Sequence, residues 1–120
     1  MPPAKTAAEL VAEAKASAPT CTAAEAAKRL AADPTLVLVD LREPPEQAQA
    51  RIARAALVPR GVLEFQIEKL APDRRQPILL HCGSGGRAAL AARSLAELGY
   101  ENVTIVLGPF EELKRAVGGA

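Results

Sequence analysis

The chain has 120 residues, 49% of them hydrophobic, and a formal net charge of +1 at pH 7. A chain of this length can bury a core of its own as one domain, and so balanced a charge argues against a dedicated nucleic-acid or membrane-surface protein. No apolar stretch reaches the roughly 18 residues of a membrane span, and Met1 to Lys15 has no apolar leader segment, so we expect a cytoplasmic protein without nucleic-acid or membrane partners.

Two capping boxes predict two helices near the N-terminus. The segments Thr6–Glu9 and Thr22–Glu25 have the spacing at which the threonine and glutamate side chains accept hydrogen bonds from backbone N–H groups that the first helical turn leaves free. Pro19 ends the first helix. We therefore expect residues 1–19 to form an N-terminal helical extension, followed by a short edge strand around Cys21.

Four continuous apolar runs predict strands that are covered on both faces. They are residues 36–39, 55–58, 78–80 and 103–107. Apolar side chains at helical spacing predict helices between the strands, within residues 63–70 and 88–98. This alternation is typical of an α/β domain, and we expect a small, mostly parallel sheet of about five strands with helices on both faces.

Three candidate site residues lie within three residues of the ends of predicted strands. Cys82 comes after the third apolar run, and Asp40 and Arg42 come after the first. In open parallel sheets, ligands bind beyond the carboxyl ends of the strands, where helix N-termini converge. We therefore expect these side chains at the same rim of the sheet.

A glycine-rich turn joins the third strand to the next helix. Because glycine tolerates positive φ values, successive N–H groups of such a turn can point inward and form an anion cradle. Together with the positive end of the helix, these donors favour the thiolate form of Cys82. The alternative is a tight turn after a small core cysteine, but an arginine that closes the turn suits an anion better. The candidate loop residues are Gly83, Ser84, Gly85, Gly86 and Arg87.

The other cysteine and the single histidine are expected to be structural. Cys21 is interpreted as a small buried residue rather than a reactive thiol, and neither cysteine has the spacing of a metal ligand. His81 precedes Cys82, and adjacent strand residues point to opposite faces. We therefore expect a partly buried histidine that is not the base for Cys82, and no metal or cofactor.

The loop and the helix after it resemble the active-site segment of the rhodanese-like sulfurtransferases. That family has a cysteine that opens a C-x-x-G-x-R loop, then a small-residue helix, Gly-Tyr and a strand, and the same order occurs in HCGSGGRAALAARSLAELGYENV. The segment LVLVDLREPPEQ is similar to the family's Asp-x-Arg-Glu signature, with Glu46 at its acidic position. VPRGVLEF resembles a segment of a single-domain branch that carries an extra N-terminal helix. The resemblance implies a rhodanese-like fold, with residues 20–120 as a single domain.

The resemblance also implies sulfur transfer by covalent catalysis. Cys82 would take sulfane sulfur from a small-molecule donor such as thiosulfate, or from a persulfide on another protein, and the loop N–H groups would hold the persulfide anion. A thiol or cyanide would accept the sulfur. Arg87 would close the loop and favour anionic donors, with Asp40 and Arg42 as supporting candidates. Arg60 would either guide anionic donors or be a solvated surface charge.

Two other functions stay open. Cysteine-dependent phosphatases and arsenate reductases use a C-x5-R loop, whose extra residue widens the ring of N–H groups for a tetrahedral oxyanion. Cys82 to Arg87 is C-x4-R, which fits a single sulfur atom better. A sulfur-carrier or interaction module would instead deliver its persulfide to a partner protein without turnover on small molecules.

Two segments depart from the family's pattern. Residues 50–55 lack the two glycines, the histidine and the proline of the usual Gly-His-Ile-Pro-Gly-Ala segment. Near the C-terminus, Gly108-Pro109-Phe110 and Leu113 replace a Gly-Gly before an aromatic residue and a later tryptophan. We expect these changes to affect loop position and substrate access rather than the chemistry of the cysteine.

Overall fold

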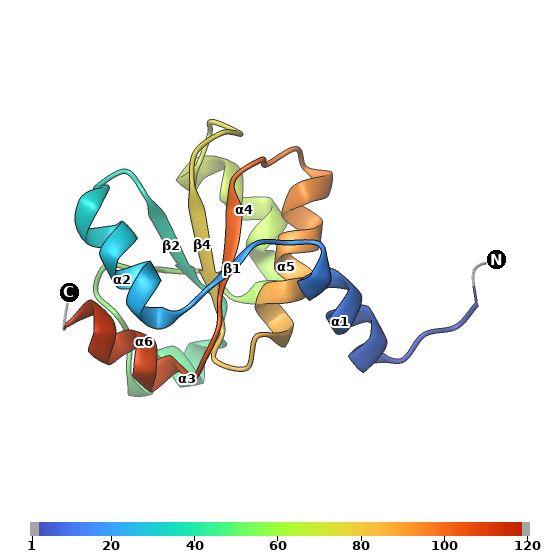
Figure 1. Cartoon of the computed structure of the whole chain (residues 1–120), viewed down its shortest axis with the longest axis horizontal. Coiled ribbons are helices and arrows are strands. Elements are labelled where there is room, and N and C mark those ends of the chain that lie inside the picture. Colours follow the sequence, from blue (N-terminus) through green and yellow to red (C-terminus); the bar gives the residue numbers. More distant parts are fainter. Residues whose placement is uncertain (1–2, 119–120) are drawn as a thin grey trace.

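The computed structural model describes residues 3–118 and has the predicted α/β architecture. Five strands form one sheet in the order β1-β5-β4-β2-β3, and all of the pairings are parallel (Figure 1). The strands are β1 (Thr20–Cys21), β2 (Val37–Asp40), β3 (Ala56–Leu57), β4 (Ile78–His81) and β5 (Val103–Val106).

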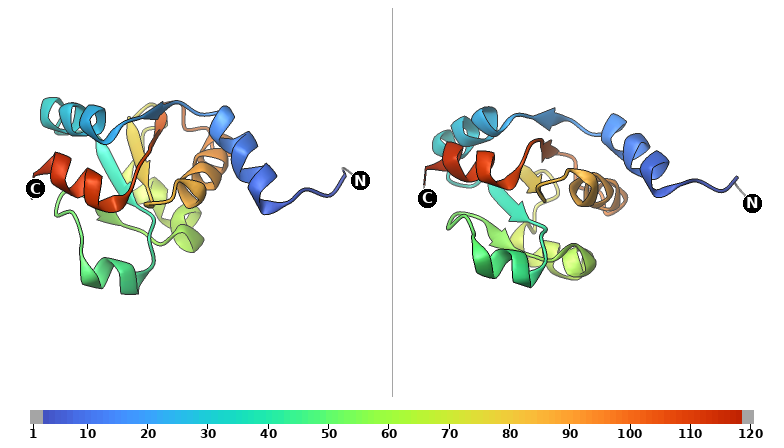
Figure 2. Two further views of the ribbon diagram at one scale, coloured as in Figure 1. Left: turned by 60° about the horizontal axis from the view of Figure 1, so that its bottom comes forward. Right: turned by 90° about the horizontal axis from the view of Figure 1, so that it is seen from below.

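Helices cover both faces of this sheet (Figure 2). Their bounds are α1 (Ala7–Ala16), α2 (Ala23–Ala32), α3 (Pro44–Gln49), η1 (Arg60–Val62, a 3-10 helix), α4 (Leu63–Leu70), α5 (Gly86–Glu97) and α6 (Phe110–Val117). α2 and α6 pack against each other on one face, whereas α4 and α5 lie on the other face, where α1 packs against α5. None of the helices within residues 3–118 is long and apolar enough to cross a membrane.

Both predicted capping boxes are present. Thr6 caps α1 and Thr22 caps α2, and each threonine oxygen accepts a hydrogen bond of 3.1 Å from the backbone N–H three residues later. The short helices α3 and α6 were not predicted. α3 begins with two prolines, a residue that favours the first turn of a helix, so the sequence did contain a signal for it.

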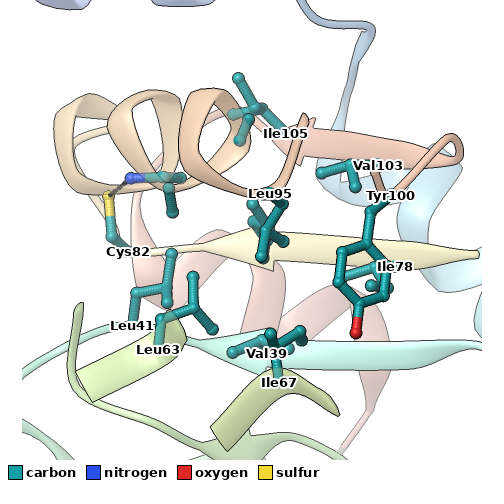
Figure 3. Close-up of a cluster of buried hydrophobic side chains, with 14 of the residues drawn as sticks. Val39, Leu41, Leu63, Ile67, Ile78, Cys82, Leu95, Tyr100, Val103 and Ile105 are labelled. Atoms are coloured by element: carbon teal, nitrogen blue, oxygen red, sulfur yellow. Dashed lines mark hydrogen bonds between the residues drawn. The ribbon is translucent and has the colours of Figure 1, made fainter. Parts of the chain in front are cut away.

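The strands bury alternate side chains in two hydrophobic layers. Leu80 packs with α4 and α5, and its neighbour Leu79 packs with α2 and α6. Figure 3 shows the first of these layers, to which β2 contributes Val39, β5 contributes Ile105 and α5 contributes Leu95. Because both faces of the sheet are covered, its strands are continuous apolar runs in the sequence.

The strand ends differ from the predicted runs in ways that matter for the site. β3 spans only Ala56–Leu57 and is shorter than the run 55–58, although the N–H of Val58 still donates to the carbonyl oxygen of Asp40. β5 ends one residue early, before a turn at Gly108 with φ of +102°. β4 is one residue longer than predicted and ends at His81, which brings Cys82 directly to the rim.

Candidate active site

Cys82 lies in the turn between the central strand β4 and helix α5. Gly83 and Gly85 in this turn have φ values of +99° and +88°, a conformation that residues with a Cβ rarely adopt. Gly85 is the N-cap residue of α5, and the helix begins at Gly86. The glycines therefore let the chain fold back tightly around the cysteine side chain.

Two backbone N–H groups point at the sulfur of Cys82. Gly85 N lies 3.1 Å from Cys82 Sγ and Ala88 N lies 3.4 Å from it, while Ser84 Oγ is 3.8 Å away. Figure 3 shows the cysteine where β4 meets the first turn of α5. The amide of Ala88 was not among the predicted residues, although the first N–H groups of any helix lack an intrahelical partner. The arrangement favours negative charge on the sulfur.

Arg87 is held by Glu46 of α3. Its guanidinium donates to both carboxylate oxygens of Glu46, at 2.6 and 3.2 Å, and to the carbonyl oxygen of Cys82 at 2.9 Å. The hydrogen bond from Arg87 and one from the backbone of Glu43 lower the pKa of Glu46 to about 2. The pair is therefore charged at neutral pH and ties the loop to α3.

Asp40 and Arg42 form a second, more deeply buried ion pair. Arg42 Nη2 lies 2.9 Å from Asp40 Oδ2, and the same guanidinium donates to the carbonyl oxygen of Ala50 at 2.7 Å. Its Cζ atom lies 3.5 Å from the centre of the Phe110 ring, a cation–π contact that the sequence did not reveal. Both carboxylate oxygens of Asp40 thus accept hydrogen bonds from Arg42.

A cavity of about 410 Å³ opens beside Cys82. The loop contributes Cys82, Gly83, Ser84 and Arg87 to its lining, and the charged side chains from other segments are Arg42, Glu46 and Glu111. Both arginines are paired with carboxylates, as described above. The arginines of the cavity therefore offer an incoming anion little net positive charge.

Two residues considered in the sequence lie apart from the sulfur. Arg60 pairs with Glu64 at 3.0 Å and donates to Ser94 Oγ at 3.1 Å, and it does not line the cavity beside Cys82. His81 is 1% exposed rather than partly buried, and its Nε2 lies 3.2 Å from the carbonyl oxygen of Gly108. Burial lowers the pKa of His81, which keeps the ring neutral at pH 7.

Other interactions hold in place the two segments that depart from the family's pattern, residues 50–55 and 108–113. Arg54 donates to three backbone carbonyl oxygens, of Leu30, Asp33 and Leu36, and so anchors the segment 50–55 to the end of α2. In the second segment Pro109 is the N-cap residue of α6, which places Phe110 in the first turn and against Arg42. Both segments thus contribute to the walls of the cavity, through Ala50 and Phe110.

Within residues 3–118 no group of three or more His, Cys, Asp or Glu side chains is arranged to hold a metal ion. Cys21, on β1, is 8% exposed and does not line the cavity beside Cys82.

Comparison with known proteins connects this geometry to a family. The family model described as "Rhodanese-like domain" matches residues 22–116. The chain is 32% identical to a sulfurtransferase from Allochromatium vinosum over 81 residues, which cover 68% of this chain and 74% of that protein. It is also 32% identical to the thiosulfate:glutathione sulfurtransferase of Saccharomyces cerevisiae over 91 residues, covering 67% of this chain and 66% of that protein.

Among solved structures, the fold is similar to that of a Rhodopseudomonas palustris protein of unknown function, described as a possible tyrosine phosphatase. The TM-score is 0.80 at 28% identity, and the match covers 100% of this chain and 98% of that chain, so it includes the N-terminal helix. The family match, the sulfurtransferase relatives and the cysteine loop at the end of β4 agree. The chain belongs to the rhodanese-like family, and sulfur transfer is the general activity that its relatives support.

Proposed function

We propose that the protein carries sulfane sulfur as a persulfide on Cys82 and transfers it to a thiophilic acceptor. The observation that supports this most directly is the pair of backbone N–H groups, from Gly85 and Ala88, at 3.1 and 3.4 Å from Cys82 Sγ. Both groups belong to the start of α5, where the helix dipole also favours an anion. These backbone groups thus favour negative charge on the sulfur without a histidine that acts as its base.

The reaction has two half-reactions. In the first, the thiolate of Cys82 attacks the outer sulfur of thiosulfate, the S–S bond of thiosulfate breaks, and sulfite leaves with the bonding electron pair. In the second, an acceptor such as cyanide or a thiolate attacks the outer sulfur of the Cys82 persulfide, and the cysteine leaves as thiolate. The yeast relative, named for thiosulfate and glutathione, supports such a donor and a thiol acceptor. Ping-pong kinetics are expected.

The size of the loop favours sulfur over phosphate. Cys82 and Arg87 are separated by four residues, and two backbone N–H groups of this turn donate to the same sulfur atom. A phosphatase also needs an acid to protonate the leaving group. Asp40 is a poor candidate for this role, because both of its oxygens accept hydrogen bonds from Arg42.

A sulfur-carrier function is the second candidate, and the charges of the cavity favour it. Arg42 and Arg87 are each neutralised by a carboxylate, and Glu111 adds a negative charge to the lining. A dianion such as thiosulfate gains little from such a lining, whereas the persulfide of another protein does not depend on it. The donor in this case would be a protein persulfide.

The experiment that tests the proposal is the intact mass of the protein after incubation with thiosulfate and removal of the excess. We expect the wild type to gain one sulfur atom, cyanide to remove it, and Cys82→Ser to gain none. Cys21→Ser is the matched control, because this buried cysteine lies outside the cavity, and it should gain sulfur like the wild type.

Different results identify different errors. Sulfur bound to Cys82→Ser would overturn the persulfide mechanism, and loss of loading in Cys21→Ser would require a dithiol mechanism. If the wild type loads sulfur only from a persulfidated protein, the carrier function replaces the thiosulfate reaction. Repeated turnover of thiosulfate and cyanide to sulfite and thiocyanate would exclude a carrier that never turns over on small molecules.

A further inference from the structure

Helix α1 contacts the cysteine loop through two of its side chains. Val11 and Lys15 are four residues apart and so lie on the same side of the helix. A Cβ atom built on Gly86 would lie 3.9 Å from a methyl group of Val11, and one built on Gly85 would lie 3.1 Å from both Cε and Nζ of Lys15. The buried residue Ala14, 2% exposed, fixes this side of α1 against the core.

The ammonium of Lys15 is thus placed next to the residue that donates to the cysteine. Gly85 N lies 3.1 Å from Cys82 Sγ, and Lys15 Nζ lies against the other side of the same residue. The two 3.1 Å contacts are joined by the Cα–Cβ and N–Cα bonds of residue 85. Their lengths add up to an upper limit of about 9 Å between Lys15 Nζ and Cys82 Sγ. At physiological salt, where the Debye length is about 8 Å, this interaction is partly screened, but at about 0.01 M salt the Debye length is about 30 Å and the charge acts on the sulfur.

The charge of Lys15 has no carboxylate partner within the described part of the chain, residues 3–118. Its side chain is only half exposed, and it lies at the N-terminal end of α5, where the helix dipole disfavours a cation. When the Cys82 sulfur carries a negative charge, it attracts the Lys15 ammonium, and the location of this cation at the helix end becomes favourable. A lysine in this position therefore suits the charged forms of the cysteine, not the neutral thiol.

We propose that Lys15 is a positioning residue of the site. Its side chain packs against Gly85, and its ammonium group stabilises negative charge on the sulfur of Cys82. The inference rests on the proposed function, because both the attacking thiolate and the persulfide carry this negative charge. It also assigns a role to the N-terminal helix, which lies outside the residues that the family model matches. The arginines of the cavity are paired, so the supporting charge comes from α1.

The test is the pH dependence of the rate at which iodoacetamide alkylates Cys82, followed by mass spectrometry of the peptide that contains it. The midpoint is the pH at which the alkylation rate reaches half of its maximum. In Lys15→Met, which keeps the aliphatic part of the side chain, we expect this midpoint to move to higher pH by about half a unit at low salt. Lys15→Arg should keep the wild-type midpoint. Lys28→Met is the matched control, because this exposed lysine is on α2, across the sheet, and its loss changes the net charge equally.

The salt dependence of the midpoint distinguishes an effect of the Lys15 charge from an effect of its packing. At about 1 M salt the Debye length falls to about 3 Å, so the difference between wild type and Lys15→Met should largely vanish. An unchanged midpoint in Lys15→Met at low salt would overturn the proposal, and so would an equal shift in Lys15→Arg or in Lys28→Met. A shift that persists in full at high salt and is matched by Lys15→Arg would show that Lys15 acts by packing alone and would also overturn it.

Alkylation requires no sulfur donor, so the two proposals can fail separately. If the wild type gains no sulfur from any donor but Lys15→Met still shifts the midpoint, the persulfide function is wrong and the charge effect on Cys82 stands. If sulfur is gained as expected but the midpoint does not move, the function stands and Lys15 has no part in it. Thermal unfolding of each variant shows whether the fold is intact.

Discussion

Replacement of Gly85 by alanine tests whether the N–H geometry of the loop drives sulfur loading. Gly85 has φ of +88° and its N–H lies 3.1 Å from Cys82 Sγ. An alanine in the left-handed region costs roughly 1–2 kcal/mol. The added methyl would also meet Cε and Nζ of Lys15 at 3.1 Å, but the end of a flexible side chain can move away.

The strain is relieved most simply by rotation of the peptide before Gly85, which turns its N–H away from the sulfur. A hydrogen bond to a charged acceptor contributes about 1.5–3 kcal/mol, so its loss should slow persulfide formation by roughly 10- to 150-fold. The rate of sulfur gain from thiosulfate, measured by intact mass at timed intervals, checks this value.

Gly99→Ala is the matched control for the backbone cost. Gly99 follows the end of α5 with φ of +92°, and no atom lies within 4 Å of the position that its Cβ would take. Both variants should lose similar stability, about 3 to 6 °C in Tm for each kcal/mol, but only Gly85→Ala should load sulfur slowly. If Gly85→Ala loads at the wild-type rate, the N–H of Gly85 is not needed to hold the charged sulfur, and the reasoning fails.

Three further predictions concern the ion pairs. Asp40→Asn removes one partner of a pair whose side chains are 4% and 7% exposed, so the free energy of unfolding in urea should fall by about 3–5 kcal/mol; an unchanged value would mean that the buried Arg42 needs no carboxylate. Glu46→Gln should weaken the tie between α3 and Arg87 and slow sulfur loading. Because the pKa of Glu46 is about 2 in the fold against an ordinary 4.5, its carboxylate stabilises the protein above pH 4.5 and this contribution is lost as the pH falls towards 2. Unfolding measured between these pH values should therefore show a steeper loss in the wild type than in Glu46→Gln, and parallel curves would contradict the assignment.

The features that local sequence determines were predicted well. The apolar runs mark strands because both faces of the sheet are covered, and this places Cys82 at the end of β4. The predicted positive φ of Gly85 is present, since a turn between a strand and a helix must reverse the chain within a few residues. Such features depend only on a residue and its neighbours along the chain.

The contacts that depend on tertiary packing were not predictable in the same way. Arg87 and Glu46 meet across 41 residues of sequence, and the ring of Phe110 lies against Arg42 only because α6 begins where it does. Arg60 follows a strand end like the other candidates, yet its side chain turns to Glu64. The direction of a long flexible side chain is set by its partners, which no local pattern specifies.

The donors around the sulfur also determine how the reaction should respond to pH. Gly85 and Ala88 contribute backbone N–H groups, which carry no titratable proton, so the same two donors are available to the thiol, the thiolate and the persulfide. Burial lowers the pKa of the His81 ring, whose Nε2 lies 3.2 Å from the carbonyl oxygen of Gly108, so this ring stays neutral at pH 7. His81 should therefore add no step to the rise of sulfur loading with pH.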